Sequence, residues 1–179
     1  MSTEMMQVSD NLPAEVSDEL ALVEESNSQF LSFQLADETY CVDILTVSEI
    51  RGWQRPTHLP NSPSYIKGVI NIRGDIIPII DLREKFQVCD PQYTKSTVII
   101  VLTTHTETKS RTVGVVVDSV SDVFDFNKKD IKEAPNSSGT IDARTIRGLC
   151  DIDDEIIVVL DVDVMLDLTE IEDYYRNLI

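Results

Sequence analysis

The stretch Gly68-Val-Ile-Asn-Ile-Arg73-Gly74-Asp-Ile-Ile-Pro78-Ile-Ile-Asp81-Leu82 decides the fold. Two apolar, β-branched runs flank Arg73 and Gly74, and a Gly between such runs supplies the positive φ angle that a tight reversal needs. The stretch therefore predicts a β-hairpin. Because neither arm alternates strictly between apolar and polar residues, we expect protein to cover both faces of the hairpin and the charged Arg73 to lie at its tip.

The second arm of this hairpin carries two further signals. Pro78 has no amide hydrogen to donate, which predicts that its strand lies at a sheet edge or carries a bulge. Asp81, followed three residues later by Glu84, matches a capping box. A short helix is therefore expected directly after the strand.

The hairpin pattern occurs twice in the chain. Residues 66–81 align without a gap with residues 146–161, and six of the sixteen positions are identical. A shorter echo relates residues 47–50 to residues 120–123. A unit of four or five short strands that is repeated once predicts two small β-barrels related by a pseudo-twofold axis. The sequence leaves open whether hairpins are exchanged between the barrels.

The remaining elements follow from shorter patterns. Hairpins are expected at residues 30–44 and 97–118, and Asp43 is placed to cap a short segment from Ile44 to Ile50. Helical spacing of apolar residues after Asp161 predicts a helix packed against the barrels. The expected organisation is an acidic mobile tail (1–28), a folded domain with repeats at about 29–90 and 95–166, and a C-terminal helix (167–179).

Charge is distributed unevenly along the 179 residues, whose formal net charge is −17. Residues 1–29 hold 7 acids and no Lys or Arg, residues 150–179 hold 10 acids and one Arg, and residues 30–149 hold 15 acids and 14 bases. The acidic ends are most simply explained by solubility, with a basic partner as the alternative. Because phosphate binding needs a basic patch, this distribution argues against a nucleic-acid partner.

Cysteine usage and hydropathy bear on the compartment. The chain has an odd number of cysteines, and the three, Cys41, Cys89 and Cys150, lie far apart in the sequence. Such cysteine usage is typical of proteins in a reducing compartment. The N-terminus lacks a basic segment followed by an apolar one, and the longest apolar runs fall far short of the roughly 20 residues that span a membrane. We therefore expect a cytoplasmic protein with no direct membrane insertion.

No catalytic motif is present. The glycines form neither a dinucleotide-binding nor a phosphate-binding loop, and there is no G-x-S-x-G or H-E-x-x-H. His58 and His105 lie in predicted loops without a partner at ligand spacing. The acidic run at residues 151–155 resembles the start of a calcium loop, but Ile156 stands where that loop needs Gly. We expect neither an enzyme nor a metal or other cofactor.

Three side chains, Arg73, Trp53 and Tyr65, are candidates for a contact with a partner. Arg73 is the strongest candidate, because the turn itself would accept Asn, Asp or Lys, and Arg is the cation most used for bidentate contacts at protein interfaces. Trp53 and Tyr65 flank a Pro-rich loop. We interpret both as lids over the core, with an interface as the alternative.

These patterns, taken together, resemble the CheW family of bacterial chemotaxis coupling proteins. The resemblance covers about Gln29 to Leu166 and rests on five motifs, namely Phe30-Leu-x-Phe-x-Leu35, Asp43-Ile-Leu-x-Val-x-Glu-Ile-Arg-Gly52, Tyr65-Ile-Lys-Gly-Val-x-Asn-x-Arg-Gly74, Ile77-Pro-Ile-x-Asp-Leu82 and Val113-Gly-x-Val-Val-Asp118-x-Val-Ser-Asp-Val123. It implies an all-β fold of two SH3-like five-stranded barrels with short helices, and an adaptor without catalytic activity or cofactor.

The resemblance also implies partners. A member of this family holds the regulatory domain of the histidine kinase CheA to the cytoplasmic tips of chemoreceptors, so the chain would be recruited to membrane-associated receptor arrays and be monomeric when isolated. The receptor-binding residues it implies are Arg73, Val47, Glu49, Gly68, Asn71, Val98, Gly114 and Val123. The kinase domain would dock on the first barrel, with Ile44 and Leu45 as contacts.

Two other functions remain open from the sequence. The same module can couple a different pathway, such as surface motility or a second-messenger cascade. A small-ligand-binding protein on a β-barrel scaffold is the second alternative, and a ligand-dependent shift of the melting temperature would reveal it.

Overall fold

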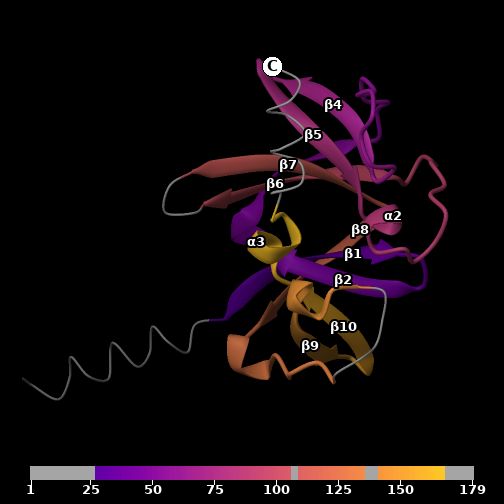
Figure 1. The fold of residues 1–179 in the computed structure, drawn as a ribbon. Coiled ribbons are helices and arrows are strands. Elements are labelled where there is room, and N and C mark those ends of the chain that lie inside the picture. Colours follow the sequence, from indigo (N-terminus) through magenta and orange to yellow (C-terminus); the bar gives the residue numbers. More distant parts are fainter. Residues whose placement is uncertain (1–26, 106–108, 136–140, 168–179) are drawn as a thin grey trace, which may run out of the picture.

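The computed structural model describes residues 27–105, 109–135 and 141–167, and Figure 1 shows their arrangement. Ten strands account for most of these residues, and each helical segment has only three or four residues. In chain order the elements are β1 (Ser28–Leu35), β2 (Glu38–Asp43), the 3-10 turn η1 (Ile44–Thr46), β3 (Val47–Gly52), β4 (Ile66–Ile72), β5 (Asp75–Asp81), α2 (Leu82–Lys85), β6 (Val98–His105), β7 (Ser110–Val117), β8 (Ser119–Phe126), η2 (Lys128–Asp130), η3 (Ala143–Thr145), β9 (Ile146–Ile152), β10 (Glu155–Leu160) and α3 (Val162–Met165).

The strands form two five-stranded sheets. We call the sheet with the order β8-β1-β2-β10-β9 barrel A and the sheet with the order β3-β6-β7-β5-β4 barrel B. Each sheet contains one parallel pair, β2 with β10 in barrel A and β5 with β7 in barrel B. All other pairs are antiparallel. The two sheets therefore have the same internal order of strand directions, as a duplicated unit requires.

Neither sheet corresponds to one sequence repeat. The first repeat contributes β1 and β2 to barrel A and β3, β4 and β5 to barrel B, while the second contributes β6 and β7 to barrel B and β8, β9 and β10 to barrel A. Hairpins are thus exchanged between the barrels, which answers the question that the sequence left open. Each barrel is complete only when strands from both repeats are present.

A short backbone bridge brings the two edge strands of each sheet together. In barrel B the segment after β3 pairs with β4 through Thr57 and Val69, and in barrel A the segment after β8 pairs with β9 through Lys132 and Leu149. Gly68 lies at the first of these bridges with a φ of +133°, and an added Cβ would sit 2.0 Å from the carbonyl oxygen of Thr57. Only glycine fits this close backbone approach.

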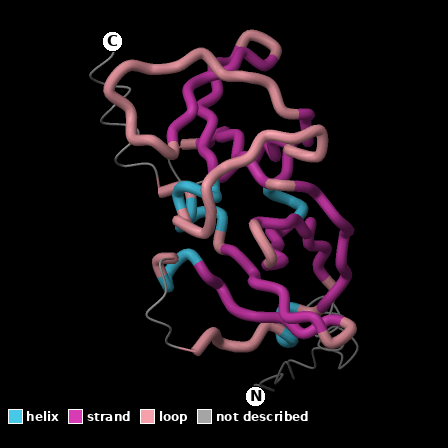
Figure 2. Tube along the Cα trace, turned by 90° about the vertical axis from the view of Figure 1, so that its right-hand side faces the viewer, coloured by secondary structure: helices cyan, strands magenta, loops and turns pink. Residues whose placement is uncertain are grey.

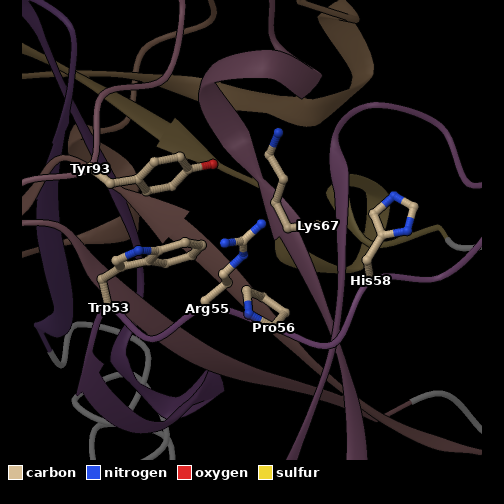
Figure 3. Close-up of a pocket in the computed structure, with 6 residues that line it drawn as sticks. All are labelled: Trp53, Arg55, Pro56, His58, Lys67 and Tyr93. Atoms are coloured by element: carbon tan, nitrogen blue, oxygen red, sulfur yellow. The ribbon is translucent and has the colours of Figure 1, made fainter.

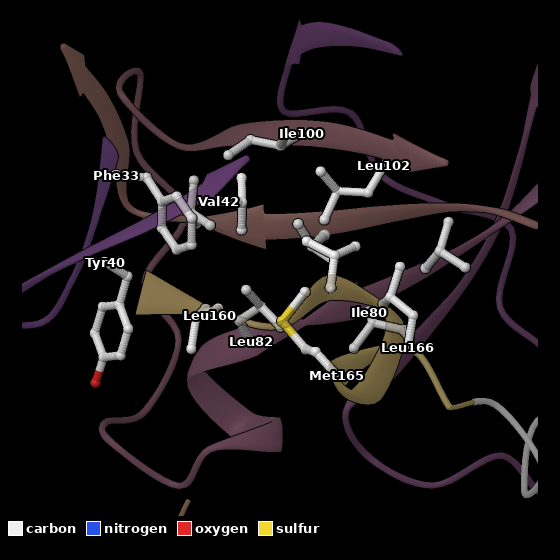
Figure 4. Packing of buried hydrophobic residues seen from close by; sticks show 14 of the residues in the cluster. Phe33, Tyr40, Val42, Ile80, Leu82, Ile100, Leu102, Leu160, Met165 and Leu166 are labelled. Atoms are coloured by element: carbon white, nitrogen blue, oxygen red, sulfur yellow. The ribbon is translucent and has the colours of Figure 1, made fainter. Parts of the chain in front are cut away.

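Both faces of the central strands are buried, in three separate apolar clusters. The interior of barrel A is filled by Phe30, Cys41, Phe126, Cys150, Ile157 and Val159. The interior of barrel B is filled by Ile70, Ile72, Ile77, Ile79, Ile99, Val101 and Val116. A larger cluster lies between the two sheets and includes Phe33, Tyr40, Val42, Ile80, Leu82, Ile100, Leu102, Leu160, Met165 and Leu166 (Figure 4).

This shared cluster explains why the sequence lacks strict alternation. On β5, Ile77 and Ile79 point into barrel B, whereas Ile80 packs in the shared cluster. A strand that is covered on both faces needs apolar residues at successive positions. The prediction that protein covers both faces of the hairpin is confirmed for this arm, although Ile76 near the tip is 61% exposed.

The helices α2 and α3 lie at the level where the two barrels meet. Figure 1 places α2 and α3 between the upper sheet, which carries β4 and β5, and the lower sheet, which carries β9 and β10. The turned view of Figure 2 shows the same two lobes with a narrower region between them. Asp81 accepts a hydrogen bond from a backbone amide in the first turn of α2, which confirms the predicted cap, and Asp161 does the same in α3.

Two local predictions, for Asp43 and Pro78, are corrected. Asp43 caps only η1, because Val47 to Gly52 is extended and pairs with β6. Pro78 lies in β5, which has a neighbouring strand on both sides and is therefore not an edge strand. Pairing with β7 begins only at Ile79, so the missing amide hydrogen of Pro78 leaves no gap in the ladder of hydrogen bonds. The register shift lies in the partner strand β4, between Ile66 and Gly68.

Glu84 does not complete the predicted capping box. Its Oε1 accepts a hydrogen bond from Lys67 Nζ at 2.6 Å, while Asp81 alone accepts the amide of Arg83. The predictions for the tail at residues 1–28 and the helix at 167–179 fall almost entirely outside the described residues. Within the described chain, no helix has the length and apolar character needed to cross a membrane.

Candidate partner-binding surface

The tip of the β4–β5 hairpin holds Arg73 away from the barrel. Arg73 has a φ of +54° and Gly74 a φ of +97°, as in the tight two-residue turns that suit the twist of a hairpin. Asn71 fixes the turn, because its Oδ1 accepts a hydrogen bond from the amide of Gly74 at 2.9 Å. The side chain of Arg73 is 83% exposed. The predicted position of Arg73 at a turn tip is confirmed.

Glu49 on β3 is the carboxylate that orients this guanidinium. Its Oε2 accepts a hydrogen bond from Arg73 Nη2 at 2.9 Å, and its Oε1 accepts one from Arg51 Nη1 at 3.0 Å. Glu49 is only 20% exposed, so the three charges form a small network at the edge of barrel B. An exposed ion pair of this kind contributes little to stability. Its main effect is to limit the directions in which Arg73 points.

The corresponding hairpin of barrel A provides an internal comparison. Its turn is formed by Asp153 and Asp154, both with positive φ angles of 52° and 66°. The same backbone turn is therefore built with acidic residues at this tip and with Arg-Gly at the other. The fold does not need a cation at Arg73, so its ion pair with Glu49 is a feature of the surface.

The structure separates the other predicted receptor-binding residues into exposed and buried sets. Gly68 and Gly114 are buried, and a Cβ at Gly114 would lie 2.5 Å from Ile79 Cδ1 and 2.9 Å from Ile99 Cγ2. Val47 and Val98 are half-buried and pack against the shared cluster. Packing gives each of these four residues a structural role, so they support a surface rather than form its exposed part.

Val123 and the two predicted kinase contacts lie elsewhere. Val123 is 44% exposed on β8, in barrel A, where it is paired with Leu31 of β1. Ile44 and Leu45 lie in η1, the turn that carries the chain from β2 of barrel A to β3 of barrel B. Leu45 is 88% exposed. A leucine that exposed has no packing role in the isolated molecule and suits a protein contact.

Two exposed isoleucines were not anticipated. Ile76 is 61% exposed beside the Arg73 turn, and Ile156 is 64% exposed at the equivalent position of barrel A. The gapless alignment of residues 66–81 with 146–161 pairs these two positions, so their repetition was visible in the sequence. Their exposure was not, because an apolar residue in such a run looks like any other core residue.

Arg83 was also missed, although it is the largest fully buried side chain of the described residues. Its guanidinium donates to Asp81 Oδ1 at 2.9 Å and Oδ2 at 2.7 Å, and to Asp118 Oδ1 at 2.8 Å. Burial alone would lower the pKa of Arg83, but its hydrogen bonds and charge interactions with Asp81, then with Asp118, raise the pKa above its ordinary value. Arg83 therefore stays charged and holds the β5–α2 junction to the β7–β8 junction.

Comparison with known proteins gives these features a family. The family model of the CheW-like domain matches residues 29–170, which include β2 to β10 and all of β1 except Ser28. The chain belongs to the CheW-like family. Among the similar proteins is the chemotaxis protein CheW of Klebsiella aerogenes, which is 40% identical over 147 residues that cover 82% of this chain and 86% of the relative. The chemotaxis protein CheW of Bacillus subtilis is 27% identical, and the match covers 80% of this chain and 89% of the relative.

A solved structure agrees with this membership. The scaffolding protein TtCheW from Thermoanaerobacter tengcongensis is similar with a TM-score of 0.71 and 26% identity, and the match covers 92% of this chain and 96% of that chain. The CheW-like fold of two SH3-like barrels, which the sequence predicted, is thereby confirmed. The chain is accordingly a member of a chemotaxis scaffold family, whose members are in general not enzymes.

Proposed function

We propose that this CheW-like chain is the adaptor that couples chemoreceptors to the histidine kinase CheA. The family and its scaffolding members support an adaptor. The observation that carries the receptor side is the Arg73 guanidinium, which is 83% exposed and is oriented by a hydrogen bond to the half-buried Glu49. An oriented Arg at a rigid tip can form charge-assisted, bidentate hydrogen bonds with a carboxylate on a partner.

The receptor contact extends from Arg73 over neighbouring groups of barrel B. Asn71 and Glu49 fix the direction of Arg73, and Ile76 adds an exposed apolar side chain beside the turn. A charged anchor next to an apolar one is the usual composition of an interface centre. In this arrangement Val47, Val98, Gly68 and Gly114 act by supporting the strands from below.

The kinase contact involves η1. Leu45 and Ile44 lie on the turn between the barrels, and Leu45 offers a nearly fully exposed apolar side chain. Receptor and kinase thus bind at separate places on one rigid body, which lets a small adaptor hold both at once. The chain acts in the cytoplasm, without catalysis, and joins the receptor array through these contacts.

Charge reversal at Arg73 tests the receptor side. We expect Arg73→Asp to abolish receptor-fragment binding, because the new carboxylate repels both Glu49 and the acidic group of the receptor. The loss of a hydrogen-bonded charge pair costs about 2–5 kcal/mol of binding free energy. Thermal stability should change by less than about 1 kcal/mol at so exposed a position. Titrations with a receptor fragment and with the kinase regulatory domain, alongside thermal melts, measure both effects.

Arg147→Asp is the matched control. Arg147 is exposed on the equivalent hairpin of barrel A, so the same change of charge should leave receptor binding intact. Kinase binding should persist in both variants. Normal receptor binding by Arg73→Asp, or an equal loss in Arg147→Asp, would show that Arg73 is not the receptor contact.

A further inference from the structure

A second open site lies at the other end of β4 from Arg73. It is a pocket of about 380 Å³ lined by Trp53, Arg55, Pro56, His58, Lys67 and Tyr93 (Figure 3). Trp53 follows β3 directly, Lys67 lies near the start of β4, and Tyr93 comes from the loop between α2 and β6. A volume of this size is large enough for one or two side chains of a bound partner.

Two stacked aromatic rings form one wall of the pocket. The ring centroids of Trp53 and Tyr93 are 4.2 Å apart, and their planes differ by 17°. Tyr93 is held from below, because its hydroxyl donates to Asp81 Oδ2 at 3.1 Å and the Arg83 guanidinium lies 5.1 Å from its ring centre. The wall is therefore rigid before any ligand arrives, which reduces the entropy lost on binding.

The polar groups of the pocket are nearly all donors. Within the described part of the chain, Arg55, His58 and the indole N–H of Trp53 make no hydrogen bond or ion pair through their side chains. Lys67 is already paired with Glu84 at 2.6 Å. Figure 3 shows the Arg55 guanidinium between the indole ring and Lys67. Such a set recognises an acceptor that carries negative charge.

Barrel A shows that the fold does not require this arrangement. The alignment of residues 47–53 with 120–126 places Phe126 at the position of Trp53 and Lys128 at that of Arg55. Phe126 is only 6% exposed and stacks on Phe30 inside barrel A, with ring centroids 4.1 Å apart. In barrel B the equivalent ring is partly exposed and lies next to a free guanidinium. A pocket of about 480 Å³ does lie beside Phe126, but its lining combines two lysines with three carboxylates, Asp125, Asp130 and Asp151. The fold therefore does not require a set of donors at this position.

We propose that this pocket binds an acidic segment of a partner protein. A Glu or Asp side chain would accept hydrogen bonds from Arg55 and from the indole N–H of Trp53, and a neighbouring apolar side chain would pack on the Trp53 and Tyr93 rings. The excess of acids lies at the two ends of the chain, whereas residues 30–149 hold 15 acids and 14 bases, so exposed donors in this middle part can attract an acidic segment. Since the proposed function gives the chain protein partners, this site adds a contact separate from Arg73.

Trp53 is the only tryptophan of the chain, so its fluorescence reports on this pocket alone. The full-length protein is titrated with a short synthetic peptide of Glu and Ala around one central Leu. The same peptide with Lys in place of Glu serves as a control. We expect a saturable change of Trp53 emission with the acidic peptide, weakened by added salt, and none with the basic one.

Variants test the role of Arg55. Arg55→Glu should weaken the binding of the acidic peptide by about tenfold or more, and a tenfold change corresponds to about 1.4 kcal/mol of binding free energy. Arg55→Gln, which removes the charge without adding repulsion, should have a smaller effect in the same direction. Lys128→Glu makes the same charge reversal at the equivalent exposed position of barrel A and should leave the affinity within about twofold. Thermal melts of each variant confirm that it is folded.

Several results would overturn this proposal. They are the absence of a saturable change, an equal response to both peptides, or unchanged affinity in Arg55→Glu. Free glutamate binding as tightly as the peptide would indicate a small-molecule site. A changed Trp53 emission, without peptide, after the seven acids of residues 1–29 are replaced by amides would assign the pocket to the chain's own N-terminal segment. None of these results depends on the Arg73 titration, so the two proposals fail separately.

Discussion

The buried cation Arg83 shows how single residues join distant parts of this chain. Its guanidinium makes hydrogen bonds with Asp81, Asp118 and the carbonyl oxygen of Gln92, and Asp118 Oδ2 also accepts the amide of Ala36 in the β1–β2 turn. Asp118 therefore connects α2 to a turn of barrel A. A buried charge that is fully paired stabilises its surroundings only while every partner remains in place.

Removal of one partner should be costly. Asp118→Ala leaves Arg83 with an unpaired donor and the amide of Ala36 without its acceptor. We expect a loss of about 2–3 kcal/mol in the free energy of unfolding, at the lower end for a buried pair because the Asp118 side chain is 32% exposed. Urea unfolding measures it. Asp125→Ala is the control, because it removes an exposed acid of β8, and it should change the free energy of unfolding by less than about 0.5 kcal/mol.

Buried thiol and phenol groups make stability depend on alkaline pH. Burial, and then the charge of Cys150, raises the pKa of Cys41 from 9.0 to about 12. Burial and a hydrogen bond to Glu38 also raise the pKa of Tyr40. A raised pKa means that the folded state keeps a proton that the unfolded chain loses. The stabilisation from Cys41 is therefore complete below pH 9 and is lost as the pH rises from 9 to 12, and that from Tyr40 is lost as the pH rises above 10.

We expect the free energy of unfolding to fall above pH 9, by up to about 1.4 kcal/mol per pH unit for each such group. Urea titrations at a series of pH values measure the slope. Cys41→Val removes one titrating group from the interior of barrel A and should reduce the slope between pH 9 and 12. If the free energy of unfolding of Cys41→Val depends on pH in the same way as that of the unmodified chain, folding does not raise the pKa of Cys41.

At the scale of elements, the bridge between β3 and β4 depends on one glycine. Gly68→Ala would place a methyl group against the Thr57 carbonyl at a φ of +133°, so the bridge between Thr57 and Val69 must open. We expect a loss of about 2–4 kcal/mol, as for other strained backbone positions. Gly52→Ala is the control, since a Cβ there meets no atom within 4 Å. Equal melting temperatures of the two variants would show that the bridge between Thr57 and Val69 does not stabilise barrel B.

Most strands were predictable from sequence, and the exceptions have identifiable causes. The 66–82 hairpin and its Asp81 cap follow from local signals, namely two β-branched runs, a Gly and a capping side chain. The strand β3 was read as part of a capped segment, because Asp43 and Ile44 do form a turn and nothing local shows that it ends at Thr46. Its strand partner β6 lies about fifty residues further along the chain, where no local pattern can point to it.

The geometry of the candidate site was predictable to a similar depth. Arg73 stood out because such a turn would accept Asn, Asp or Lys, and the acidic residues at the same turn of the repeat agree with this reasoning. The pairing of Arg73 with Glu49, and that of Arg83 with Asp118, depends on strands from different parts of the chain. The burial of Gly114 was equally invisible, because a glycine between valines gives no sign of which face it occupies.

At the scale of the whole molecule, the exchange of hairpins makes the two repeats depend on each other. Four of the eight strand pairings join strands of different repeats, namely β1 with β8, β2 with β10, β3 with β6, and β5 with β7. β3 pairs only with β6, and β8 only with β1. The shared cluster between the sheets also draws residues from both repeats. A repeat by itself thus has unpaired strands and half of each core.

Cutting the chain after Asp90, in the loop between α2 and β6, separates the repeats without breaking a strand. We expect residues 1–90 and 91–179 each to be unfolded alone, because a small incomplete core supplies too little stability. Mixed in equal amounts, they should assemble into one folded 1:1 complex, since every strand then regains its neighbours. Circular dichroism, Trp53 emission and size-exclusion chromatography would detect this assembly. Either fragment melting cooperatively alone, or a mixture that stays unfolded, would contradict the dependence that strand exchange imposes.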